Sequence, residues 1–273
     1  MKRFLRAFAW LLLAADGYYA YRVADLYFRQ DSYVYHPKKE WVETPTAKGL
    51  EFQELTFGSS DDASISAWYI PAKTAKGTIL FCHGNARNMS SDMDAIEMFH
   101  QDGFNVLAFD YRGYGKSTGH PTEQGTYEDA QKAWDWLTRS KKEQPSRIII
   151  CGRSLGAAIA AHLAAGNPPK ALILEAAFTS LPEAGQDNYP YFPVKLLSKY
   201  RYNTLEALKQ VRCPVLVVHS RDDKVVPFSH GKKLYEAARG PKTFVEIGGP
   251  HKGGYKPTLG IYHEGVKRFL ESL

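Results

Sequence analysis

The segment at residues 151–156, with the sequence CGRSLG, constrains the fold of this chain more than any other. It follows the strand-forming run at 147–150 and precedes an alanine-rich, helix-forming run at 157–164. A serine at a sharp strand-to-helix turn has a strained backbone and holds its hydroxyl clear of the sheet. Glycines two residues before and after it leave room where side chains would collide with backbone. The pattern predicts a nucleophilic Ser154; the alternative is a turn whose serine only caps the helix.

Beyond residue 46 the chain alternates between short apolar runs and helical segments. The runs predict strands at 50–57, 64–70, 78–82, 104–109, 147–150, 171–174, 215–218 and 243–247, with further helices at 92–100, 122–137, 229–238 and 259–270. A turn at 58–62 makes the first two strands an antiparallel hairpin. Continuous apolar strands alternating with helices predict a mostly parallel sheet covered on both faces. A length of 273 residues suits one such domain.

One segment, residues 178–212, is too long for an ordinary connection between a strand and the next. Because it follows a strand, it starts at the carboxyl edge of the sheet, where open α/β sheets bind ligands. We therefore predict a small lid over the site. Its aromatic side chains are expected to line an apolar substrate path: Tyr189, Tyr191, Phe192, Tyr200 and Tyr202.

A serine is a poor nucleophile unless a base accepts its proton, and two later loops offer a base and an acid. The base is predicted to be His251, which lies among glycines at 248–254, in a loop with no apolar face that would bury a histidine. The acid is one of two neighbours, Asp222 and Asp223. We favour Asp223 because the turn DKVVP starts there, whereas Asp222 also fits a solvent-facing turn residue.

The loop HGNA at 83–86 follows the predicted strand 78–82 and is expected to help bind a developing oxyanion. Gly84 allows the backbone to approach closely, so the donor is predicted to be the amide of Asn85, with Ala86 as the alternative. The second donor is the amide of Leu155, directly after the serine. His83 is expected to support the loop rather than to react.

Four motifs stand in order: HGNA at 83–86, DYRGYGKS at 110–117, GRSLG at 152–156 and DKVVP at 223–227. Together they resemble the motifs of α/β-hydrolase serine hydrolases, most of all the small-lid, membrane-anchored branch related to the ABHD depalmitoylating enzymes. The resemblance implies an α/β-hydrolase fold and cleavage of carboxylic esters or thioesters through an acyl-enzyme. It also implies a triad of Ser154, Asp223 and His251, a structural role for 110–117, and no metal or cofactor.

Two other functions remain open. Hydrolysis of an amide uses the same nucleophile, base and acid as hydrolysis of an ester. An aminopeptidase-like enzyme is therefore an alternative. Such an enzyme would bind a free amino terminus through acidic residues near the lid, for which Glu175, Glu183 and Asp187 are candidates. A non-catalytic ligand-binding homologue is disfavoured, because it would not need a base aligned on a serine.

The first residues form a separate segment. A basic start with Lys2, Arg3 and Arg6 leads into an apolar run that Asp16 interrupts, and aromatic residues follow up to Arg29. No convincing signal-peptidase site follows, and the run is short for a spanning helix. We predict an N-terminal hydrophobic anchor at 1–30, interfacial or short, before a hydrolase domain at 31–273. The alternative is an extra helix packed on that domain.

The net charge of +6 is dispersed, without a basic run or a nucleic-acid motif. It therefore favours attraction to anionic membrane surfaces over nucleic-acid binding. The three cysteines, Cys82, Cys151 and Cys213, lie in or beside apolar runs and are expected to be inert thiols rather than a disulfide framework.

Overall fold

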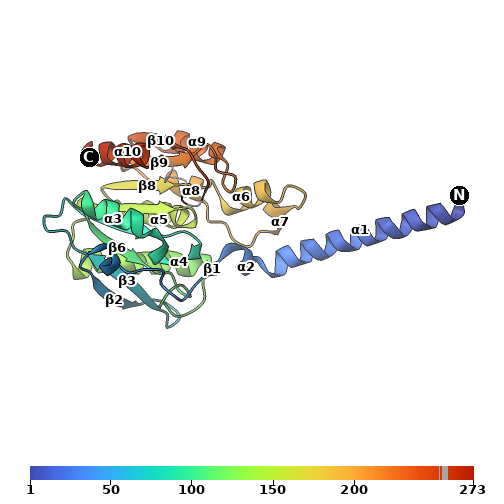
Figure 1. Ribbon diagram of the computed structural model, residues 1–273, viewed down its shortest axis with the longest axis horizontal. Helices are drawn as coiled ribbons and strands as arrows, with labels where there is room; N and C mark the ends of the chain where they lie inside the picture. Colours follow the sequence, from blue (N-terminus) through green and yellow to red (C-terminus); the bar gives the residue numbers. More distant parts are fainter. Residues whose placement is uncertain (252, 254–257) are drawn as a thin grey trace.

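The computed structural model describes residues 1–251, 253 and 258–273. A sheet in the order β10-β9-β8-β7-β4-β6-β3-β2 forms its centre (Figure 1). The strands are β2 (Gln53–Gly58), β3 (Ser64–Ile70), β4 (Thr78–Cys82), β6 (Asn105–Phe109), β7 (Ile148–Arg153), β8 (Ala171–Glu175), β9 (Val215–Ser220) and β10 (Lys242–Ile247). β3 pairs antiparallel with β2 and β6, and all other neighbours are parallel. The predicted hairpin and mostly parallel sheet are confirmed.

Helices cover both faces of the sheet. One face packs against α3 (Met93–Gln101) and α10 (Leu259–Glu271); the other packs against α4 (Glu123–Asp135), α5 (Leu155–Gly166), α8 (Thr204–Leu208) and α9 (Phe228–Ala237). Along β4, Phe81 belongs to the first core and Leu80 to the second. Both faces are buried, which explains why the central strands read as continuous apolar runs.

Helix ends follow local capping chemistry. The predicted helix at 122–137 begins where the Thr122 hydroxyl accepts a hydrogen bond from the Gly125 amide at 3.0 Å. After Asp135 it widens into a π-helical turn at Trp136–Ser140. Short 3₁₀ turns occur at Pro45–Lys48, Met89–Asp92 and Pro145–Arg147.

The insertion at 178–212 contains two helices besides α8, namely α6 (Leu181–Asn188) and α7 (Val194–Leu197). Its aromatic residues have different surroundings, and Tyr189 lines an apolar pocket beside the N-terminal helices. Tyr202 is fully buried and its hydroxyl lies 2.8 Å from that of Tyr35, because a buried phenol needs a polar partner. Tyr191, by contrast, is 85% exposed at the tip of the insertion.

The N-terminal segment forms a single helix, α1 (Lys2–Phe28), which projects away from the domain (Figure 1). Every side chain from residue 2 to residue 21 is exposed. This first part of the segment is not packed in the core, whereas Leu26 near its end is buried against the domain. Among the helices of the described residues, none is both long enough and apolar enough to cross a membrane.

Candidate active site

Ser154 lies at the turn between β7 and α5 with φ of 53° and ψ of −117°. This left-handed conformation is strained for a residue with a side chain. The close approach of α5 to the sheet requires both neighbouring glycines. A Cβ on Gly152 would lie 2.2 Å from the Gly156 carbonyl oxygen, and one on Gly156 would lie 2.1 Å from that of Cys82. The strand, the turn and the helix predicted around Ser154 are confirmed.

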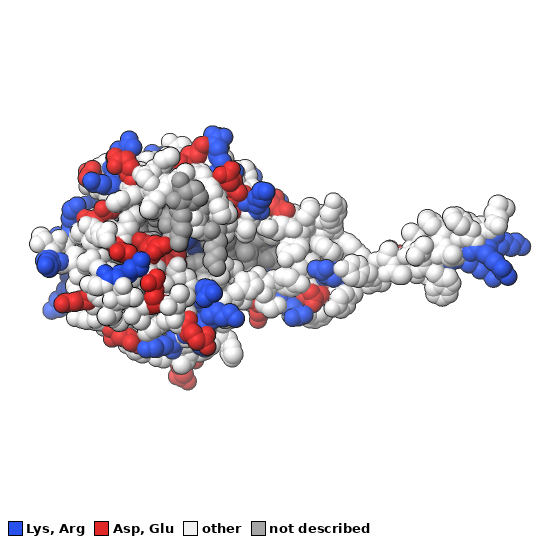
Figure 2. Space-filling model, in the orientation of Figure 1, with Lys and Arg blue, Asp and Glu red and all other residues white. Residues whose placement is uncertain are grey.

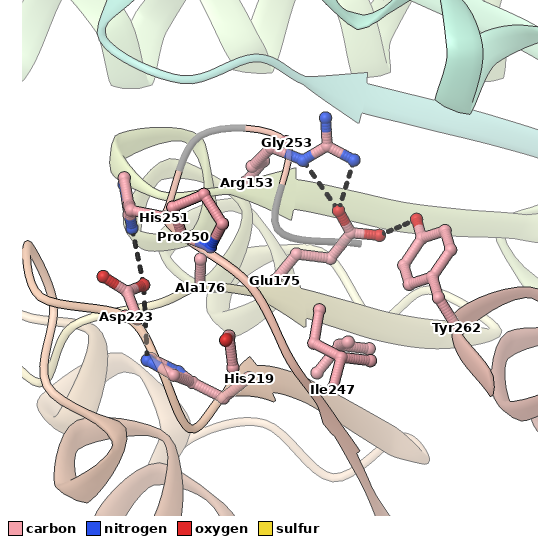
Figure 3. Close-up of a pocket in the computed structure, with 12 residues that line it drawn as sticks. Arg153, Glu175, Ala176, His219, Asp223, Ile247, Pro250, His251, Gly253 and Tyr262 are labelled. Carbon is pink, nitrogen blue, oxygen red and sulfur yellow. Dashed lines mark hydrogen bonds and ion pairs between the residues drawn. The ribbon is translucent and has the colours of Figure 1, made fainter. Parts of the chain in front are cut away.

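The structure brings Ser154, His251 and Asp223 together from loops after β7, β10 and β9. Ser154 Oγ lies 3.0 Å from His251 Nε2. On the other side of the ring, His251 Nδ1 lies 2.6 Å from Asp223 Oδ2 (Figure 3). A proton on Nδ1 that is donated to the carboxylate leaves Nε2 able to accept the serine proton. Lys252 and Gly254 of the predicted glycine loop lie outside the described residues.

Asp223 is buried, and every oxygen of its carboxylate has a donor. Oδ1 accepts hydrogen bonds from the amides of Val225 and Val226, each at 2.9 Å. Burial alone would raise the pKa of Asp223, but the hydrogen bond from His251 and the two amides outweigh it, and the pKa lies below its ordinary value. Behind it, His219 Nε2 donates to the Val226 carbonyl at 2.9 Å and lies 3.7 Å from Asp223 Oδ2.

The neighbouring carboxylate has a different position. Asp222 is exposed, and its Oδ2 accepts a hydrogen bond from the Gly249 amide at 2.8 Å. The Ser220 hydroxyl donates to the carbonyl of the same glycine at 2.5 Å. Both bonds hold the loop that carries His251, and the sequence did not reveal either of them.

The loop at 83–86 is held so that the Asn85 amide has a fixed direction. His83 Nδ1 donates to the Gly84 carbonyl at 2.7 Å, and that carbonyl shares a peptide plane with the Asn85 N–H. The Asn85 side chain donates to the Val34 carbonyl at 3.0 Å. Leu155 is the first residue of α5, where amides have no partner within the helix.

A two-residue ladder also supports this loop. β1 (His36–Pro37) pairs in parallel with β5 (Ala86–Arg87), and the His36 amide donates to the Asn85 carbonyl at 3.0 Å. The sequence predicted only a connector around residue 36, because two residues carry no recognisable strand pattern.

The motif at 110–117 packs behind the same loop. Tyr111 donates its hydroxyl to the His83 carbonyl, and Tyr114 donates to that of Asn85, both at 2.9 Å. The His83 ring lies against both tyrosine rings, 4.2 and 5.1 Å between centroids. Burial lowers the pKa of His83 to about 4, so it is neutral at physiological pH. This geometry agrees with the expectation that His83 supports the loop.

A buried ionic cluster anchors the serine turn from the other side. Arg153 Nε donates to Glu175 Oε2 at 2.9 Å, and the guanidinium also pairs with Asp92. The Tyr262 hydroxyl donates to the second oxygen of Glu175 (Figure 3). The Glu175 carbonyl accepts the Ser154 amide at 2.8 Å. The cluster joins four elements that are distant in sequence, so no local pattern could have predicted it.

A cavity of about 470 Å³ opens in front of the serine. Its lining includes Asn85, Ser91, Arg153, Ser154 and His251. This arrangement leaves room for a substrate carbonyl between the serine, the histidine and the loop at 83–86.

Comparison with known proteins places the chain in a family. A family model described as serine aminopeptidase, S33, matches residues 73–205, which include the serine turn but neither Asp223 nor His251. An Arabidopsis thaliana relative, alpha/beta hydrolase domain-containing protein WAV2, is 35% identical over 91% of this chain and 90% of its own. A Macaca fascicularis relative, lysophosphatidylserine lipase ABHD12, is 34% identical over 66% of this chain and 50% of its own.

Among solved structures, the Pyrococcus furiosus esterase PF2001 superposes with a TM-score of 0.77 at 22% identity. The match covers 88% of this chain and 97% of that protein. It confirms the predicted fold, whereas the narrower resemblance to depalmitoylating enzymes remains a prediction. The chain belongs to the α/β-hydrolase family.

Proposed function

We propose that this protein is a serine hydrolase that cleaves carboxylic ester or thioester bonds, with Ser154 as nucleophile, His251 as base and Asp223 as orienting acid. The observation that carries the proposal is the chain of hydrogen bonds Ser154 Oγ–His251–Asp223, at 3.0 and 2.6 Å, which begins at a strained turn. A serine aligned on a base that is itself oriented by a buried carboxylate is the arrangement used for acyl transfer.

In the proposed reaction, His251 Nε2 accepts the Ser154 proton as Oγ attacks the acyl carbon. The amides of Leu155 and Asn85 donate to the oxyanion of the tetrahedral intermediate. His251 then passes the proton to the departing alcohol or thiol, leaving an acyl-serine. Water attacks the acyl-serine with His251 again as base, which releases the acid and restores the serine.

An aminopeptidase is the second candidate, because the matching family model carries that description. The acidic residues available to bind an amino terminus already have cationic or histidine partners. Glu175 pairs with Arg153, Glu183 with a lysine at 2.9 Å, and Asp187 with His230 at 2.8 Å. A substrate ammonium would have to displace these partners, which favours the ester over the peptide substrate.

We also propose that α1 attaches the enzyme to a membrane surface without crossing it. Its exposed side chains are largely apolar, and Lys2, Arg3 and Arg6 are basic residues in its first turns, at the end far from the domain (Figure 2). Apolar side chains favour the acyl boundary of a bilayer, and basic ones favour anionic headgroups. A lipid-borne ester is the substrate such a position would supply, consistent with the lipase named among the relatives.

The test of the reaction uses Ser154→Ala, with Ser91→Ala as matched control because Ser91 lines the same cavity. Ser154→Ala should abolish labelling by a fluorophosphonate and lower kcat on p-nitrophenyl acetate by ~10⁴-fold or more. Ser91→Ala should label normally. Unchanged labelling of Ser154→Ala contradicts the assignment, and faster cleavage of aminoacyl amides than of esters would favour the peptidase.

A further inference from the structure

An apolar pocket lies between the N-terminal helices and the lid, apart from the residues that carry the proposed reaction. Leu26 and Val34 line it from α1 and from α2 (Gln30–Val34), and Leu181, Val194 and Leu197 line it from α6 and α7. Its volume is about 100 Å³, enough for a few methylene groups but not for a lipid headgroup. The apolar lining suits a hydrocarbon chain.

Polar contacts fix the two walls of this pocket to each other. The Gln30 side chain is only 8% exposed, and it donates to the Leu197 carbonyl and accepts from the Lys199 amide, both at 2.8 Å. Next to it, the Tyr200 hydroxyl donates to Asp31 at 2.6 Å. The pocket is therefore a built feature of the junction between α2 and the lid, not a gap between loosely placed segments.

The pocket and the cavity in front of Ser154 share a wall. Val34 lines the pocket, and its carbonyl accepts the hydrogen bond from the side chain of Asn85, which lines the cavity. This hydrogen bond places the pocket next to the cavity in which a substrate carbonyl would meet Ser154.

The segment of the lid that lies beside α1 carries aromatic side chains. Tyr191, in the segment between α6 and α7, is 85% exposed. Tyr19 of α1 stacks on Phe192 with 5.3 Å between ring centroids, so this part of the lid lies against the projecting helix. Exposed aromatic side chains beside an apolar helix suit contact with a lipid surface.

We propose that this pocket binds the distal methylene groups of the substrate's acyl chain, which enters from a lipid surface between α1 and the lid. The inference deepens the proposed function and depends on it for the position of the carbonyl. It follows that the enzyme prefers medium or long acyl chains. Residues of α1, α2 and the lid determine this preference, and the reacting groups do not.

The experiment fills the pocket and measures chain-length preference. Val194→Trp places a large side chain in the pocket, and Leu196→Trp is the matched control on the same helix, outside the lining. Both variants and the full wild-type chain are assayed on p-nitrophenyl acetate, butanoate, octanoate and decanoate. Each methylene buried contributes about fourfold in affinity.

We expect Val194→Trp to lower kcat/KM on octanoate and decanoate by at least ~10-fold, from two or more lost methylene sites, with acetate unchanged. Leu196→Trp should follow the wild-type profile. Identical chain-length profiles for Val194→Trp and Leu196→Trp overturn the inference. Retained acetate hydrolysis shows that a variant is folded and that the proposed function holds.

Binding of sodium decanoate, followed by calorimetry, tests the pocket without turnover. The dissociation constant should rise at least ~10-fold in Val194→Trp and stay unchanged in Leu196→Trp. Equal affinity in both variants contradicts the pocket even if no ester is cleaved. If the wild-type chain cleaves no ester at all, that result contradicts the proposed function instead.

Discussion

The carboxylate of Asp222 accepts a hydrogen bond from the Gly249 amide at 2.8 Å, two residues before His251. The adjacent Asp223 contacts His251 itself at 2.6 Å. Neighbouring carboxylates thus act on one loop in two ways: one holds its backbone at the surface, and the other holds the imidazole from a buried position. Gly249 has φ of 95°, a conformation that suits glycine at this turn.

This division predicts very different effects for the two substitutions. Asp223→Asn should keep the fold but favour the wrong imidazole tautomer, lowering kcat by up to ~10⁴-fold. Asp222→Asn retains an oxygen that can accept from Gly249, so it should cost less than about tenfold, since only one surface hydrogen bond changes. Steady-state kinetics on p-nitrophenyl acetate, with melting temperatures of both variants, make the comparison. A larger loss in Asp222→Asn would move the orienting role to that residue.

A second prediction concerns α1. Deleting residues 2–18 removes side chains that are all exposed, but it keeps Tyr19 on the lid and Leu26 in the pocket. The shortened protein should retain its melting temperature and its turnover of p-nitrophenyl acetate. It should lose most of its binding to anionic vesicles, because apolar and basic contacts with the bilayer are removed together.

Vesicle co-sedimentation and hydrolysis of a vesicle-borne ester measure this effect. A deletion of residues 2–29 is the contrasting variant, since it also removes the buried Leu26. Equal sedimentation of the full chain and the 2–18 deletion would refute surface attachment through α1 while leaving the proposed triad unaffected.

The third prediction concerns His83 and pH. The pKa of His83 is about 4 in the folded chain because of burial, against an ordinary value of 6.5. Between these values the unfolded chain binds a proton at this position and the folded chain does not. The free energy of unfolding therefore falls as pH falls from 6.5 towards 4, by about 1.4 kcal/mol per pH unit and about 2 kcal/mol by pH 5.

Urea unfolding of the wild-type chain and His83→Phe at pH 7, 6 and 5 tests this. The variant should be less stable at pH 7, having lost the bond to Gly84, but the difference should shrink as pH falls. Asp110, whose pKa burial raises to about 6, gains its proton earlier in the folded chain and opposes the trend. Asp110 Oδ1 lies 3.6 Å from His83 Nε2, but its raised pKa comes from burial and Asp110 is present in both proteins, so most of its effect cancels in the difference. A constant difference across this range would contradict a neutral, buried His83.

Short-range patterns were enough to predict much of this fold. The strand before Ser154, the turn at it and the helix after it are confirmed, because steric limits on a turn act between near neighbours. The apolar runs predicted the central strands within a few residues, since burial on both faces of a sheet requires them. The glycine-rich context also singled out His251, which the structure places beside Ser154.

The tertiary structure decided what depends on contacts between distant residues. Asp222 and Asp223 are adjacent in the sequence, and only the folded structure shows which of them contacts the imidazole of His251. Arg153 meets Asp92 and Glu175 across 61 and 22 residues, and Tyr202 is buried against Tyr35 across 167. Such pairings form when folding brings buried polar groups together and each must find a partner, a requirement that no local pattern of side chains encodes.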